Sequence, residues 1–176
     1  MKTFKTTKIL VLMFGLFTGL LAAQNITGKS VKVSVDGTSP MHNWTMTSSA
    51  GSFSGTVNGN IINNVKFAMA ANNLKSTKGK MMDNKAYDAL KADKAPNISF
   101  AASSMNIGKG IMNGKLSVAG VTKSVVVPVT VVKNGASYTI NGSANMKMSD
   151  FGMATPGFLG VRTGDAVTVK INIVAN

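Results

Sequence analysis

Three polar residues in the first third of the chain are those best suited to carry out a reaction. His42 is the one histidine among 176 residues, and Asp36 and Ser39 lie six and three positions before it. A serine, a histidine and an aspartate could form a hydrolase triad, but a triad also needs a nucleophile at a strained turn and an oxyanion hole. The stretch contains Gly37 and Pro40 and no such nucleophile turn. It is therefore predicted to be an ordinary turn, and no enzyme activity is expected.

The other residue types exclude most metal and cofactor chemistry. The chain has no Cys and no Glu, and its six Asp residues are spread between positions 36 and 165. Zinc sites built on cysteine or paired histidine, thiol catalysis, disulfides and covalent haem attachment are excluded, and the Asp spacing does not fit a calcium loop. Gly28-Lys29-Ser30 resembles the end of a phosphate-binding loop, but position 23 holds Ala where that loop needs Gly. No metal and no cofactor are predicted.

Lysine is the remaining residue type that could hold a ligand. The chain has 19 basic and six acidic residues, and its net charge is +13. The lysines are scattered, without the aromatic and Arg interleaving of single-strand binders, so nucleic acid is not a predicted partner. Two interpretations stay open: a solvated cationic surface, or attraction to an anionic ligand or, transiently, to an anionic membrane surface. The densest basic stretch could hold an anionic headgroup or be a solvated loop; it contains Lys75, Lys78, Lys80 and Lys85.

The amino terminus has the pattern of a secretory signal peptide. Lys2, Lys5 and Lys8 precede an apolar run over 9–21, and small residues follow before Gln24. This run is shorter than the roughly 20 apolar residues of a membrane-spanning helix. We predict a signal peptide over 1–23 and a single domain over 24–176, whose net charge is +10 because three lysines are lost. The protein is then expected in the periplasm of a bacterium or outside the cell.

Apolar and polar residues alternate with a period of two over most of the mature chain. The clearest run, 138–149, carries Tyr138, Ile140, Gly142, Ala144, Met146 and Met148 on one face, and 167–174 repeats the pattern. Asn-Gly pairs at 58, 113 and 134 predict tight hairpins, and Pro128 inside a valine run predicts an edge or a bulge. Eight or nine antiparallel strands predict a sandwich or a barrel. One short helix is expected near 82–92, where apolar residues recur at helical spacing.

The residues on the expected inward face are either small or long and flexible. Small residues leave room in an interior, whereas Met adapts to whatever fills it. An eight-stranded barrel can be filled by its own side chains or hold one small ligand, and composition leaves both open. The inward residues in question are Gly55, Ala68 or Ala70, Ala102, Gly142 and Ala144, with Met46, Met69, Met146 and Met148.

Three segments together resemble the YceI-like lipid/polyisoprenoid-binding family. The run GKLSVAGVTKSVVVPV over 114–129 is similar to the strand, turn and valine strand of that family, and MMDNKAYDALKADKAPNISF over 81–100 is similar to its helical segment. MKMSDFGM over 146–153 resembles the element that ends one of its strands. The order and the spacing of all three segments agree, and the resemblance covers roughly residues 30–175.

The resemblance implies an all-β fold: an antiparallel, eight-stranded, lipocalin-like barrel that encloses a long apolar ligand, either a polyisoprenoid or a fatty-acid derivative. The side chains expected to line the lumen by position in the family are Trp44, Met46, Phe53, Phe67, Met69, Phe100, Leu116, Val118, Tyr138 and Ile140. The alternating run adds Gly142, Ala144 and Met146 to this set, and His42, Lys78 and Lys80 are the candidates for a polar headgroup.

Two functions from different classes follow. The first is an exported lipid-binding protein that carries, stores or sequesters an apolar ligand in the barrel lumen. The alternative is a β-sandwich interaction or adhesion module with a filled core and a basic face. A membrane-spanning barrel is disfavoured, because the 11 aromatic residues form no girdles and the outward positions carry Lys and Asn.

Overall fold

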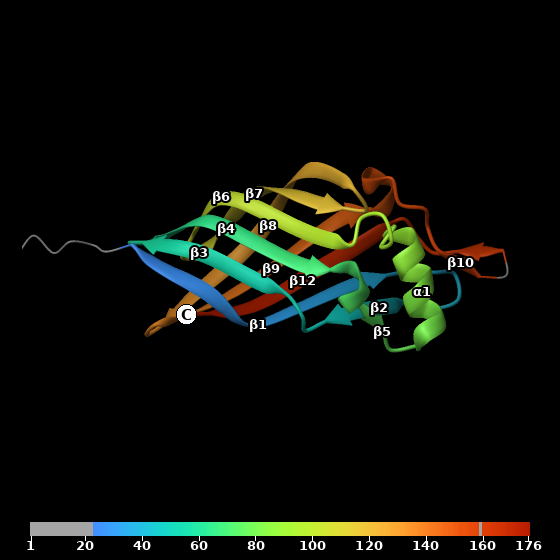
Figure 1. The fold of residues 1–176 in the computed structure, drawn as a ribbon, viewed down its shortest axis with the longest axis horizontal. Helices are drawn as coiled ribbons and strands as arrows, with labels where there is room; N and C mark the ends of the chain where they lie inside the picture. Colours follow the sequence, from blue (N-terminus) through green and yellow to red (C-terminus); the bar gives the residue numbers. More distant parts are fainter. Residues whose placement is uncertain (1–22, 159) are drawn as a thin grey trace, which may run out of the picture.

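The computed structural model describes residues 23–158 and 160–176, so the predicted signal peptide over 1–23 lies, apart from Ala23, outside the described residues. Antiparallel strands dominate the described chain (Figure 1). The strands are β1 Gln24–Gly37, β2 Trp44–Ser48, β3 Ser52–Asn58, β4 Ile61–Ala70, β5 Lys75–Ser76, β6 Asn97–Asn106, β7 Gly108–Val118, β8 Val121–Asn134, β9 Ser137–Lys147, β10 Gly157–Phe158, β11 Val161–Arg162 and β12 Ala166–Ala175. Short 3₁₀ segments are η1 Ala71–Asn73 and η2 Met148–Phe151, and the helix is α1 Lys80–Ala89.

Among these strands, eight close into one ring. The order is β1, β3, β4, β6, β7, β8, β9 and β12, and β12 pairs back onto β1 with Val33 opposite Ile171. Each neighbouring pair is antiparallel. The predicted eight-stranded antiparallel barrel is confirmed, and closure removes the free edges that an open sheet would expose.

The barrel is extended at one end by β2 and β5. The first residues of β1, Gln24–Thr27, pair with β3, whereas its last residues, Val33–Gly37, pair with β2. Strand β2 then leaves the ring and pairs with β5 instead of with β4. Helix α1 crosses this end of the barrel, next to β2 and β5 (Figure 1).

Two of the three predicted Asn-Gly turns are confirmed. Gly59 and Gly135 have φ angles of +57° and +59° in the β3–β4 and β8–β9 hairpins. The third turn, at Asn113-Gly114, is wrong because both residues lie inside β7. Gly114 is needed there for another reason: a Cβ at this position would collide with the ring of Phe100.

The helix begins two residues earlier than expected and ends at Ala89 instead of 92. Gly79 precedes it with a φ of +89°, and Lys91, with a φ of +52°, prevents its continuation. None of the described helices is long and apolar enough to span a bilayer.

The barrel interior has two halves of different character. At the end where β1 begins, large side chains are almost fully buried from solvent, and the largest of them, Tyr138, is 1% exposed. These side chains are Ile26, Ile62, Val131, Tyr138, Ile140 and Ile173. The half nearer α1 carries many of the residues that are only partly buried. A packed core and a cavity, which the composition left as alternatives, therefore occupy different halves of one barrel.

Two details of the strand pattern differ from or refine the sequence prediction. Ala68 is exposed and Ala70 is half-buried, so the inward residue of that stretch is Met69 between them. Pro128 lies on the outer face of β8 opposite Ile111, and the β8–β9 pairing begins at the next residue, Val129. Proline has no N–H to donate, so this position is an edge as predicted.

Candidate functional site

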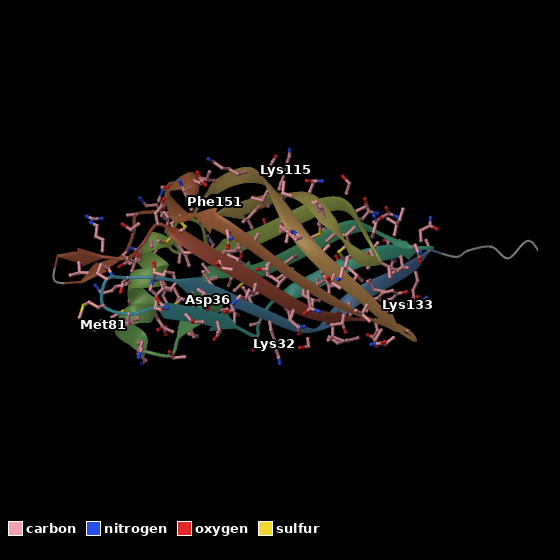
Figure 2. All side chains as sticks on the ribbon, turned by 180° about the vertical axis from the view of Figure 1, so that it is seen from behind. Lys32, Asp36, Met81, Lys115, Lys133 and Phe151 are labelled. Carbon is pink, nitrogen blue, oxygen red and sulfur yellow. The ribbon has the colours of Figure 1, made fainter. Side chains whose placement is uncertain are left out.

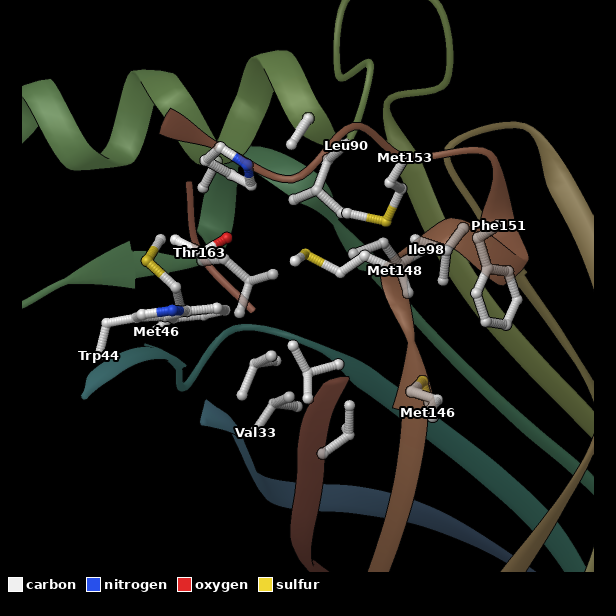
Figure 3. A pocket seen from close by; sticks show the side chains of 18 of the residues that line it. Val33, Trp44, Met46, Leu90, Ile98, Met146, Met148, Phe151, Met153 and Thr163 are labelled. Carbon is white, nitrogen blue, oxygen red and sulfur yellow. The ribbon is translucent and has the colours of Figure 1, made fainter. Parts of the chain in front are cut away.

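A cavity of about 450 Å³ lies between the half of the barrel that is not packed and helix α1. This volume falls within the ~300–1,000 Å³ range of pockets that hold small molecules. Its walls are almost entirely aliphatic, aromatic and thioether side chains (Figure 3). Such a wall offers an apolar ligand burial from water and offers water very few hydrogen bonds.

The barrel strands supply the deep wall of the cavity. Alternation places every second residue of each strand inward, and the inward residues nearest α1 form the cavity wall. The strand residues that line the cavity include Val33, Met46, Phe67, Met69, Ile98, Phe100, Leu116, Val118, Val127, Ala144, Met146, Val167, Val169 and Ile171.

The roof of the cavity comes from three segments at the α1 end. One face of α1 contributes Met82, Ala86 and Ala89, and Leu90 follows directly. Segment 148–163 contributes Met148, Phe151, Met153 and Thr163. Loop 39–42 forms part of the rim of the cavity entrance. Figure 3 shows Met46 of β2 and Met148 and Met153 of segment 148–163 around the same space. Methionine side chains deform easily, which suits a wall that has to adapt to a flexible ligand.

Hydrogen bonds hold this roof onto the barrel. The hydroxyl of Tyr87 in α1 donates to the carbonyl oxygens of Asn72 at 2.9 Å and Leu74 at 3.0 Å, and Lys75 donates to the same hydroxyl. On the other side, Lys85 Nζ donates to the carbonyl oxygen of Gly157 at 2.6 Å. Helix α1 is thus tied both to the β5 segment and to the β10–β11 hairpin.

Trp44 is positioned at the edge of the cavity by its neighbours in the sheet. Its indole ring lies flat against Gly37, where a Cβ would collide with it, and its Nε1 donates to the carbonyl oxygen of Thr38 at 3.2 Å. The glycine therefore gives the indole the room it needs to lie on the strand.

Ten of the thirteen residues predicted to line the lumen do lie on the cavity wall. They are Trp44, Met46, Phe67, Met69, Phe100, Leu116, Val118, Gly142, Ala144 and Met146. Two headgroup candidates, His42 and Lys78, lie at its entrance, whereas Lys80 is exposed at the first position of α1 and does not reach the cavity.

Phe53, Tyr138 and Ile140 point inward but do not line the cavity. All three are buried in the hydrophobic core, and Tyr138 and Ile140 belong to its fully packed end. Strand alternation shows which face a residue is on, but it does not show how far along the barrel axis the residue lies.

Polar groups near the cavity are few and lie close to its entrance. The polar residues at that end are Ser39, His42, Ser76, Lys78, Lys85, Lys147 and Thr163. The hydroxyl of Thr163 is buried, and no hydrogen-bond partner for it is found among the described residues. A buried hydroxyl without a partner is costly, so this atom is available to a polar group of a bound ligand.

The three residues that resemble a triad in sequence do not form one. Ser39 Oγ donates to the backbone carbonyl of His42 at 2.8 Å, and the His42 N–H donates back to Ser39 Oγ. Asp36 instead accepts a hydrogen bond from Thr45 at 2.7 Å and pairs with Lys170 at 2.9 Å. Stretch 39–42 is therefore the turn that its Pro predicted.

The sequence prediction missed the roof of the cavity. Ala86, Ala89 and Leu90 had the right spacing for one helix face, but no sequence pattern indicates that this face covers a cavity. Phe151, Met153 and Thr163 lie in irregular or very short elements, where periodicity carries no information.

Comparison with known proteins agrees with this architecture. A family model described as a YceI-like domain matches residues 25–175. BcnA of Burkholderia cenocepacia has a similar structure, with a TM-score of 0.70 and 24% identity over 83% of this chain and 96% of BcnA. A polyisoprenoid binding domain from Saccharophagus degradans has a TM-score of 0.68 and 10% identity over 86% of this chain and 97% of that domain.

A third solved structure, the YceI protein of Campylobacter jejuni, has a TM-score of 0.53 and 20% identity over 99% of this chain and 97% of that protein. At such identities these structures share the fold, and no curated protein sequence matches the chain. The family assignment comes from the domain model, which covers every strand of the barrel: this chain belongs to the YceI-like domain family.

Proposed function

We propose that this protein binds one elongated apolar ligand, a polyisoprenoid or a fatty-acid derivative, in the barrel cavity for transport, storage or sequestration. The observation that carries the proposal is the cavity of about 450 Å³ with its nearly continuous apolar wall. Membership of the YceI-like family supports the ligand class, as does the similarity to a domain described as polyisoprenoid binding.

The arrangement of polar groups gives the ligand an orientation. The packed end of the barrel blocks one direction, and the polar side chains lie at the α1 end. An apolar tail therefore extends into the barrel, and a polar head lies near Thr163, His42 and Lys78. Neutral or anionic heads suit this entrance best, because its charged residues are lysines.

We further propose that the protein is exported and acts in the periplasm or outside the cell after cleavage following Ala23. The basic start, the apolar run over 9–21 and the small residues before Gln24 support this. Cell fractionation and mass measurement of the protein from its own host test it: the expected product begins at Gln24, and a full-length cytoplasmic product contradicts it.

The ligand proposal is tested by extraction of the natively purified protein with organic solvent, followed by mass spectrometry. One apolar lipid per protein molecule is the expected result. In parallel, the delipidated protein is titrated with a fluorescent long-chain fatty acid and with a fluorescent polyisoprenoid. A protein that releases no lipid and takes up neither probe contradicts the proposal and favours an interaction module that uses only its surface.

A further inference from the structure

The wall of the barrel made by β7, β8 and β9 carries positive charge without any acid of its own. Between positions 94 and 149 the sequence contains no Asp. The lysines of these three strands are Lys109, Lys115, Lys123, Lys133 and Lys147. Among the described residues, Lys123 forms an ion pair with Asp150 of η2 at 4.0 Å, in which both side chains are about half exposed, and Lys147 interacts electrostatically with Asp165. Lys115 projects outward from this wall in Figure 2, whereas Lys133 lies at the end of the wall, with its Nζ 5.8 Å from the centre of the Tyr138 ring.

The same wall exposes large aliphatic side chains. Ile111 is 64% exposed and Val126 is 59% exposed. Ile111 lies directly opposite Pro128, and Val126 is two residues before Pro128 on the same face of β8, so the three form one apolar patch. Lys109 is two positions before Ile111 on the outer face of β7, next to this patch.

The backbone pairing between β8 and β9 is also interrupted at this place. Strands β8 and β9 pair from Val129–Gly142 to Asn134–Ser137, and within the described chain their pairing goes no further. Beyond it, 121–128 of β8 pairs with β7, and 143–147 of β9 pairs with β12. We call this unpaired boundary between 121–128 and 143–147 the seam. Backbone edges of two strands face each other across it without a ladder.

The seam lies directly over the cavity. Val125 and Val127 line the cavity from the β8 side, and Ala144 and Met146 line it from the β9 side. Ala144 is small and Met146 is flexible, so the β9 side of the seam can make room for a chain of methylene groups, whereas the two valines on the β8 side are branched and stiffer. The apolar patch is on the outer surface of the same stretch of β8.

We propose that the β7–β9 wall docks on an anionic lipid bilayer and that the ligand passes sideways through the seam between bilayer and cavity. Exposed aliphatic side chains lower the free energy of the system when they leave water for the headgroup region of the bilayer, and each nearby lysine is attracted to anionic lipid. The passage rests on the proposed function, since it needs an apolar ligand in the cavity, whereas the docking does not.

The charge and the residue types of this wall favour an anionic bilayer over a second copy of the chain or a nucleic acid as the partner. A second copy docked through the same wall would bring lysines against lysines, which disfavours a symmetric dimer. Single-stranded nucleic acid would need aromatic side chains for stacking, and the exposed apolar residues here are aliphatic. An anionic bilayer attracts the lysines through its headgroup charge and buries the aliphatic patch from water.

The docking face can be mapped with single cysteines, because the chain has no cysteine of its own. Ile111→Cys and Val126→Cys are labelled with a polarity-sensitive fluorophore and mixed with phosphatidylglycerol or phosphatidylcholine vesicles. Matched controls are Ile61→Cys on the opposite wall, 41% exposed, and Met81→Cys at the start of α1, 55% exposed. A blue shift is expected at 111 and 126 with phosphatidylglycerol alone, and it is lost in high salt.

Lysine variants test the charge contribution on the same vesicles. Lys109→Gln and Lys115→Gln should each weaken binding roughly fivefold, whereas Lys66→Gln on β4 should have little effect. No shift at either wall position overturns the docking proposal. A shift confined to Met81→Cys also overturns it, because docking would then take place at the cavity entrance.

The passage is tested by closing the seam. If the β8–β9 register continued, Val126 would face Asn145. The double variant Val126→Cys/Asn145→Cys is loaded with a fluorescent long-chain fatty acid and closed with a short bifunctional thiol reagent. Release to phosphatidylglycerol vesicles should slow by an order of magnitude or more. The matched control, Val132→Cys/Thr139→Cys, joins two residues that are already paired and should release normally.

Unchanged release after the seam is closed overturns the passage. Uptake is measured before cross-linking, so a protein that takes up no fatty acid contradicts the proposed function alone. The labelled single-cysteine variants still decide the docking in that case.

Discussion

At the scale of single residues, Ala144 and Gly142 show how the size of a side chain determines the space inside the barrel. Both are on the cavity wall, but a Cβ at Gly142 would come within 3.0 Å of Ile171 Cγ1 and 3.3 Å of Val127 Cγ1. A larger residue at 142 therefore strains the strand, at a cost of about 1–3 kcal/mol for overpacking. Ala144 is the better position at which to fill the cavity without disturbing the fold.

We expect Ala144→Leu to lower the uptake of a fluorescent fatty acid severalfold, because the added side chain occupies space that the ligand needs. Titration of the purified variant measures the affinity, and urea denaturation measures the free energy of unfolding. Ala101→Leu, on the exposed face of β6, adds the same atoms outside the barrel and is the control. Unchanged uptake by a folded Ala144→Leu protein would show that the ligand does not occupy this cavity.

The unpartnered hydroxyl of Thr163 leads to a second prediction at this scale. Thr163→Val keeps the shape of the side chain and removes the hydroxyl. The empty protein should become slightly more stable, because a buried unsatisfied hydroxyl is removed. Affinity for a long-chain fatty acid should fall severalfold, equivalent to ~1 kcal/mol, while affinity for a fluorescent hydrocarbon without a polar head should stay the same. Equal losses for both probes would contradict a role in headgroup binding.

At the scale of elements, the attachment of α1 decides how easily the roof of the cavity moves. One hydroxyl, that of Tyr87, connects the helix to the carbonyl oxygens of Asn72 and Leu74 and to Lys75. The helix packs few residues fully and forms few contacts with the sheet, so its attachment depends largely on these bonds, on the Lys85–Gly157 bond and on the bond from the Ser76 N–H to Asp83 at 2.6 Å.

Tyr87→Phe should therefore loosen α1 more than it weakens the barrel. Hydrogen exchange of the amides in α1 should speed up, whereas the amides of β9 and β12 should keep their protection. The free energy of unfolding should fall by only about 1 kcal/mol. Asp88→Asn, on an exposed side of the same helix, serves as the control. Uniform acceleration across the barrel would show that Tyr87 supports the whole fold and not the roof alone.

At the scale of the whole molecule, Asp36 links three strands near the entrance and makes stability depend on pH. A hydrogen bond from Thr45, followed by the contact with Lys170, holds the pKa of Asp36 below its ordinary value of 3.8. A carboxylate with a lowered pKa in the folded state stabilises that state above 3.8, and the contribution is lost as the pH falls below 3.8 toward the folded pKa.

We expect the urea midpoint of the natural protein to exceed that of Asp36→Asn at neutral pH and the difference to shrink as the pH falls below 3.8. Urea titrations over a pH series measure it, with Asp93→Asn, an exposed carboxylate in the turn after α1, as the control. A difference that is the same at every pH would mean that the charge of Asp36 does not contribute.

Much of the whole fold could be predicted from alternation and turn chemistry. The run over 138–149 has its apolar residues inside and its polar residues outside, as its period of two requires. Asn58-Gly59 and Asn134-Gly135 make the expected hairpins, but Asn113-Gly114 has the same letters and lies inside a strand. What decides that case is the ring of Phe100 on the neighbouring strand, a contact that no local pattern encodes.

The candidate site is harder to predict than the fold, because it also depends on contacts between strands that no local sequence pattern encodes. Face is a local property of a strand, so the family resemblance and strand alternation together predict ten of the wall residues. Depth along the barrel axis depends on register between strands, which is why Phe53, Tyr138 and Ile140 were placed in the lumen by sequence although they belong to packed regions. Thr163 had no pattern at all, because it lies in a loop that only the closed barrel brings over the cavity.

The packed half of the barrel gives the cavity a rigid floor. Ile26, Ile62 and Tyr138 are among its most deeply buried side chains, and such a core resists deformation. For the ligand proposed above, this floor limits the depth to which a hydrocarbon tail can enter, so a tail longer than that depth would remain partly outside the cavity.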